Sequence, residues 1–143
     1  MRMAVAMAVV ATMAAAEPGA AAGPAAAAKA DRDRRAILDL ARIPAEEEIG
    51  KPIKFVVRKL TYAGDHAFLF ASMQDAFGRP IDYTGTKLAR EQEEGLISDA
   101  FAGLFKRNAR GGWTLITADV GPTDESWATW PAEYGAPAVL FKR

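Results

Sequence analysis

The chain has 143 residues, enough for one domain, and its 18 basic and 18 acidic side chains give a formal net charge of zero. This balance lacks the clustered basic excess of proteins that bind nucleic acid or anionic membranes. With no cysteine and only one histidine, His66, the chain can form no disulfide, thiolate metal site or multi-histidine zinc site. We therefore predict no cofactor, no metal and no nucleic-acid partner.

The first 16 residues have the pattern of a secretory signal peptide. Arg2 supplies a positive charge, residues 3–13 form an uncharged and mostly apolar run, and Ala14-Ala15-Ala16 fits a cleavage site before Glu17. The run is shorter than the ~20 residues of a membrane-spanning helix, so we expect no stable membrane anchor after cleavage. The alternative is an uncleaved N-terminal anchor. Residues 17–30, rich in Ala, Gly and Pro, are predicted to form a flexible linker.

Residues 31–143 are predicted to form a single domain that begins with a helix from Asp31 to about Arg42. Asp31 suits the N-cap, and Asp33 suits the positive end of the helix dipole. The apolar stripe is narrow, so we expect one face to pack against a sheet. Pro44 is expected to end the helix, with residues 46–48 in a solvated turn or short helical turn. The stripe consists of Ala36, Ile37, Leu40 and Ala41.

The segment from Pro52 to Gln74 is predicted to be a β-hairpin around which the domain is built. Its strands are residues 53–60 and 66–73, joined by a tight turn at Gly64-Asp65. The second strand is apolar on both faces, so both faces require a cover. The helix can supply one cover, and the other must come from later in the chain. One face of this strand carries His66, Phe68 and Phe70, and the opposite face carries Ala67, Leu69, Ala71 and Met73.

Residues 97–107 fit either a helix or a strand. Ile97, Phe101 and Leu104 follow helical spacing, whereas Phe101, Gly103 and Phe105 alternate as in a strand. We favour a strand over residues 98–107, because residues 108–112 resemble a hairpin loop that leads into a clear strand over residues 113–120. The predicted fold is α+β: an N-terminal helix packed on a curved four-stranded antiparallel sheet, or cystatin-like roll, with an irregular aromatic C-terminal tail.

The C-terminal tail has two interpretations. In the favoured one, the segment from Gly121 onward covers the second face of the hairpin. In the other, its aromatic side chains form a binding surface, with Asp124 and Glu125 at the rim. The candidate binding residues are Asp124, Trp127, Trp130 and Tyr134.

A set of short motifs is spread over residues 35–141. They are Arg35, Leu40 and Arg42, then Gly50-Lys51-Pro52-Ile53, Phe55-Val56-Val57, His66-Ala67-Phe68, Pro80-Ile81-Asp82, Trp113, Gly121-Pro122-Thr123-Asp124, Trp127, Trp130, Tyr134 and Pro137. Together they resemble a family of small uncharacterised secreted (periplasmic) bacterial proteins, and none of them is catalytic. The overall plan is similar to the cystatin-like roll and to its larger relative, the nuclear-transport-factor-2-like cone, in architecture only.

We predict a non-enzymatic binding or accessory protein of the bacterial periplasm, whose partner is an envelope protein or a small apolar ligand. The alternative is a small cone-fold enzyme of the isomerase or dehydratase kind, with an Asp or His base in an interior cavity. No catalytic residue is assigned. A cavity containing His66 or Asp119 would favour the enzyme, and an exposed aromatic patch would favour a partner site. The possible bases are Asp39, His66, Asp82 and Asp119.

Overall fold

The computed structural model describes residues 23–143, so the predicted signal peptide and the first part of the predicted linker lie outside the described residues. The chain divides into two units between Arg32 and Asp33. In the first unit the described residues are helical from Pro24 onward. The second unit holds the rest of this helix and every other element. Within residues 23–143, no helix is both long enough and apolar enough to span a membrane.

The second unit contains a four-stranded antiparallel sheet with the strand order β1-β2-β3-β4. The α+β fold class and the strand assignment of residues 98–107 are thus confirmed. Gly64, with φ 57°, takes the first turn position between β1 and β2, where a tight hairpin favours glycine. The strands are β1 (Ile53–Ala63), β2 (His66–Asp75), β3 (Ala100–Arg107) and β4 (Trp113–Val120).

Helix α1 (Pro24–Ile49) is longer at both ends than predicted. It begins earlier because proline is tolerated at the first helical position and the following alanines are strong helix formers. The prediction that Pro44 ends the helix is wrong. Buried residues recur every fourth position on both sides of Pro44, so packing against the sheet holds the last turns in the helix. These residues are Ile37, Ala41, Ala45 and Ile49.

Gly50, not Pro44, ends helix α1. It has a φ of 81°, and its N–H donates to the Glu46 carbonyl over 2.7 Å, as in a glycine C-cap. The Glu46 carboxylate accepts the Ile53 N–H at 3.0 Å. The acidic residues 46–48 are therefore the last turn of α1, and one of them ties that turn to the start of β1.

Asp33 lies inside α1, so its predicted place at the positive end of the helix dipole is wrong. Its carboxylate accepts hydrogen bonds from Arg107 Nη2 and Trp113 Nε1, each over 3.0 Å. The Arg107 guanidinium also lies 4.2 Å from the Trp113 ring centroid. The Asp33 side chain is only 16% exposed, so this cluster is a partly buried link between α1 and the β3–β4 hairpin.

Replacing Asp33 with alanine is expected to lower the free energy of unfolding by about 1.5–3 kcal/mol, because Arg107 and the Trp113 indole lose a charged acceptor. Urea unfolding followed by circular dichroism measures this change. Asp39→Ala is the control, since Asp39 pairs with Arg42 on the exposed side of the same helix. It should cost no more than about 0.5 kcal/mol. Equal losses in the two variants would contradict the anchoring role of Asp33.

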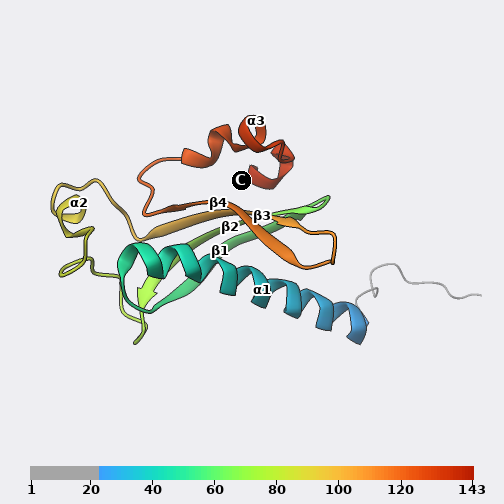
Figure 1. The fold of residues 1–143 in the computed structure, drawn as a ribbon, viewed down its shortest axis with the longest axis horizontal. Helices are drawn as coiled ribbons and strands as arrows, with labels where there is room; N and C mark the ends of the chain where they lie inside the picture. Colours follow the sequence, from blue (N-terminus) through green and yellow to red (C-terminus); the bar gives the residue numbers. More distant parts are fainter. Residues whose placement is uncertain (1–22) are drawn as a thin grey trace, which may run out of the picture. The chain divides into compact units, whose positions relative to one another are not determined.

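The sheet has a buried cluster on each face. On one face, α1 residues pack against Leu69, Phe101 and Phe105. On the other face, Phe68 and Leu104 pack against the C-terminal segment. Figure 1 shows the part of α1 from Asp33 onward and the segment around α3 on opposite sides of the sheet. The prediction that β2 is covered on both faces, by the helix and by the tail, is confirmed. The C-terminal segment comprises η3 (Ser126–Thr129), α3 (Trp130–Tyr134) and η4 (Ala138–Phe141), and α2 (Ala89–Glu93) precedes β3.

A β-bulge in β1 changes which face its later residues occupy. Val57 pairs with Ala71, but Lys59 pairs with Phe70, so Arg58 is the extra residue. Uninterrupted alternation would place Lys59 on the helix-covered face with Val57. The bulge instead places Lys59 beside Phe70, on the face that the C-terminal segment covers.

Candidate functional site

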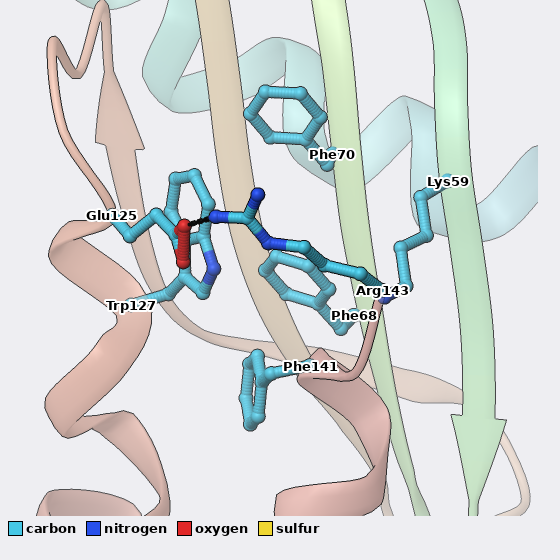
Figure 2. A pocket seen from close by; sticks show the side chains of 7 residues that line it. All are labelled: Lys59, Phe68, Phe70, Glu125, Trp127, Phe141 and Arg143. Atoms are coloured by element: carbon cyan, nitrogen blue, oxygen red, sulfur yellow. Dashed lines mark hydrogen bonds and ion pairs between the residues drawn. The ribbon is translucent and has the colours of Figure 1, made fainter.

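A pocket of about 340 Å³ lies between strands β1 and β2 and the C-terminal segment. We call it the aromatic pocket. Its volume is at the lower end of the ~300–1,000 Å³ typical of small-molecule sites. Figure 2 shows its side chains converging from the two strands and from both ends of the C-terminal segment. The lining residues are Lys59, Phe68, Phe70, Glu125, Trp127, Phe141 and Arg143.

Four aromatic rings form the apolar wall of the aromatic pocket. Phe68 and Phe70 are two residues apart on β2 and therefore share a face. The Trp127 ring lies 5.8 Å from the Phe68 ring and 5.2 Å from the Phe70 ring. Phe141 lies 4.7 Å from Phe68. Phe68 is 2% exposed, whereas Phe70 and Trp127 are half-buried, so part of this wall is accessible to a ligand.

Three charged side chains stand around these rings. Arg143 reaches across the aromatic pocket and pairs with Glu125 (Figure 2). Lys59 donates from Nζ to the Lys142 carbonyl. The side chains of Arg143 and Glu125 are 86% and 47% exposed, so solvent screens their ion pair and it contributes little to stability. The charged rim can therefore rearrange without disturbing the fold.

The last residues of the C-terminal segment are fixed to the sheet beneath the aromatic pocket. Leu140 is 1% exposed, and its carbonyl accepts a hydrogen bond from Thr61 Oγ1 over 2.8 Å. Trp130, 6% exposed, packs edge-on against Phe68 with ring centroids 6.2 Å apart. These contacts hold Phe141 and Trp127 in place, so the pocket is preformed.

The structure separates the four predicted binding residues. Trp127 lines the aromatic pocket, whereas Trp130 lies in the buried cluster behind it. Tyr134 is 42% exposed at the end of α3, and Asp124 is exposed; neither lines the pocket. Glu125, expected at the rim, does line it. Of the aromatic residues Trp127, Trp130 and Tyr134, Trp127 alone thus lines the aromatic pocket.

Sequence reasoning missed the cationic side of the pocket. Lys59 reaches it only because of the bulge at Arg58, and strand alternation gives no sign of that bulge. Arg143 follows η4 and has no motif around it. Because β2 is apolar on both faces, the sequence predicts that Phe68 and Phe70 need a cover. The C-terminal segment provides that cover.

The possible bases of an enzyme lie apart from one another, and none lines the aromatic pocket. Asp39 pairs with Arg42 on α1. His66 is 7% exposed; its Nδ1 lies 2.9 Å from the Asp65 carboxylate, in an orientation that forms no hydrogen bond. Asp119 faces Ala102 within the β3–β4 pairing.

Asp82, the fourth possible base, closes a turn. Its carboxylate accepts the Thr84 backbone N–H over 2.9 Å and a hydrogen bond from Gln92 Nε2 over 3.1 Å. The Thr84 backbone hydrogen bond, followed by the Thr84 and Gln92 side chains, lowers the pKa of Asp82 to about 2. A carboxylate with this pKa is a poor general base at neutral pH.

No family model, curated protein or solved structure matches the chain. The resemblance to small secreted bacterial proteins and the likeness to the cystatin-like roll therefore stay predictions. The candidate site rests on the geometry of the aromatic pocket alone.

Proposed function

We propose that this protein is a non-enzymatic binding protein that holds a small apolar ligand in the aromatic pocket. One observation carries the proposal: four aromatic side chains converge on a preformed cavity of about 340 Å³ that is open to solvent. Cavities of this kind, mainly apolar with a few polar groups, are typical of small-molecule sites. The predicted signal peptide supports the further proposal that binding takes place in the periplasm.

The composition of the aromatic pocket favours binding over catalysis. Acid–base catalysis needs a titratable group held within reach of the reacting atoms. Among the lining residues Glu125 is the single carboxylate, and it sits at the exposed rim in a pair with Arg143. The aromatic wall offers stacking and apolar contact, which are the interactions that retain a ligand.

Titration with N-phenyl-1-naphthylamine, whose fluorescence rises in apolar surroundings, tests this function. We expect saturable binding at one site per chain. Phe70→Ala should weaken it about tenfold or more, because burial of a phenylalanine side chain contributes roughly 1.5–3 kcal/mol. Phe70 is half-buried, so its loss should leave the fold intact.

The matched control is Phe77→Ala. Phe77 is 81% exposed and lies outside the aromatic pocket, so this variant removes the same side chain without touching the site. Its affinity for the probe should equal that of the wild type. Non-saturable binding, or the same loss in both variants, would contradict the proposed function.

A further inference from the structure

We infer that the ligand is an apolar carboxylate, whose ring or chain lies against the aromatic wall and whose carboxylate is bound by Arg143. This inference rests on the proposed function and adds the chemical class of the ligand. It is carried by the charged side chains around the aromatic pocket and by the position of the Arg143 guanidinium over the rings.

The side chains that line the aromatic pocket carry one more positive than negative charge. They comprise two cations, Lys59 and Arg143, and one carboxylate, Glu125. The Lys59 ammonium donates to a neutral acceptor, the Lys142 carbonyl. A ligand with one negative charge would complement this rim.

The Lys59 ammonium lies beside the backbone of Lys142, whereas the Arg143 guanidinium lies across the rings at Glu125 (Figure 2). Lys59 projects from β1 because of the bulge, and its hydrogen bond fixes the backbone of Lys142, directly before Arg143. From there the Arg143 side chain extends over the rings toward Glu125 (Figure 2). A carboxylate at the mouth of the pocket would thus meet a planar guanidinium, which binds carboxylates with two parallel hydrogen bonds.

In the unliganded protein, Glu125 occupies the place that the ligand carboxylate would take on Arg143. The pair is exposed and screened by solvent, so exchanging one carboxylate for another has a small cost. Binding also covers the rings with an apolar group, which excludes water from the new ion pair and strengthens it. Glu125 is therefore an internal competitor: it weakens binding of an anion and has little effect on a neutral ligand.

Calorimetric titration at low ionic strength with 2-naphthoate and its neutral amide, 2-naphthamide, tests this inference on the purified protein. We expect 2-naphthoate to bind about tenfold more tightly, because its carboxylate forms a charge-assisted hydrogen bond with Arg143 that the amide cannot form. In Arg143→Gln this preference should fall to roughly twofold or less. In Glu125→Gln the ratio of the 2-naphthoate affinity to the 2-naphthamide affinity should rise several-fold.

Glu133→Gln is the control for the Glu125 variant. It makes the same change in net charge within the C-terminal segment, but Glu133 does not line the aromatic pocket. It should leave the affinity for both naphthalene compounds unchanged. Circular dichroism and urea unfolding first show that each variant is folded as the wild type is, which separates a loss of anion recognition from a loss of folding.

The outcomes distinguish the inference from the proposed function. If 2-naphthoate and 2-naphthamide bind equally well, and neither Arg143→Gln nor Glu125→Gln changes their ratio, the apolar-ligand site stands and the anionic ligand class is overturned. If Glu133→Gln has the same effect as Glu125→Gln, the preference comes from net charge and the assigned role of Glu125 is overturned. If neither compound binds although the wild type binds N-phenyl-1-naphthylamine, the anionic ligand class is overturned and the apolar-ligand site stands. If the wild type does not bind this probe either, the inference and the proposed function fail together.

Discussion

Replacing Phe68 with alanine is expected to lower the free energy of unfolding by about 3–5 kcal/mol. Phe68 is 2% exposed, and its ring contacts those of Trp127, Trp130 and Phe141. It thus lies where the C-terminal segment meets β2. Its loss removes apolar burial and leaves a cavity that the neighbouring large rings cannot readily fill. Urea unfolding followed by circular dichroism measures the change.

Two further variants serve as an exposed control and as a milder substitution at the same position. Phe77→Ala, at an 81% exposed phenylalanine, should change the free energy of unfolding by less than about 0.5 kcal/mol. The expected loss in Phe68→Ala is a large part of a domain stability of about 5–15 kcal/mol, so Phe68→Leu provides a milder change of roughly 1–1.5 kcal/mol that keeps the chain folded. A loss below about 1 kcal/mol in Phe68→Ala would show that the C-terminal segment is not packed on β2.

Gly121→Ala is expected to be the second severe change, with a loss of about 2–5 kcal/mol from the sum of backbone strain and overpacking. Gly121 has a φ of 75°, which side chains other than glycine rarely adopt. An added Cβ would lie 2.2 Å from Ile97 Cγ1 and 3.1 Å from the Ser98 carbonyl. Gly121 cannot easily move away, because its N–H donates to the Ala100 carbonyl over 2.8 Å and its carbonyl accepts the Ser98 N–H over 3.0 Å.

Gly111→Ala separates the effect of backbone strain from that of overpacking. Gly111 has a φ of 84°, but an added Cβ would meet no atom within 4 Å. Its cost should therefore be the backbone strain alone, about 1–2 kcal/mol. Thermal and urea unfolding of both variants give the comparison. Ile97→Ala in the Gly121→Ala background should restore part of the lost stability, and equal losses at the two glycines would show that the contact with Ile97 has no effect.

The two hairpins were predictable because their signals are local. Alternating side chains predicted β1 and β4, and a run that is apolar on both faces predicted β2. Gly64-Asp65 and residues 108–112 indicated the turns. The apolar character of both faces of β2 also predicted a second cover from the tail. This prediction needed no knowledge of the tail's conformation, because a strand with two apolar faces must bury both.

The features that the sequence did not predict depend on contacts between residues that are distant in the chain. Helix α1 continues past Pro44 because Ala45 and Ile49 pack on the sheet, which local propensity does not reveal. The bulge at Arg58 has no sequence signal, yet it decides that Lys59 faces the aromatic pocket. For the candidate site, Trp127 and the rim position of Glu125 were predictable. That Trp127 lines the pocket while Trp130 is buried behind it follows from the fold of the C-terminal segment.

The most direct test of the account is to locate the bound probe by nuclear magnetic resonance. Intermolecular nuclear Overhauser effects should connect N-phenyl-1-naphthylamine with the side chains of Phe70, Trp127 and Phe141, which line the aromatic pocket. Contacts confined to apolar side chains exposed elsewhere, such as Phe77 and Leu96, would contradict the account and place binding outside the pocket.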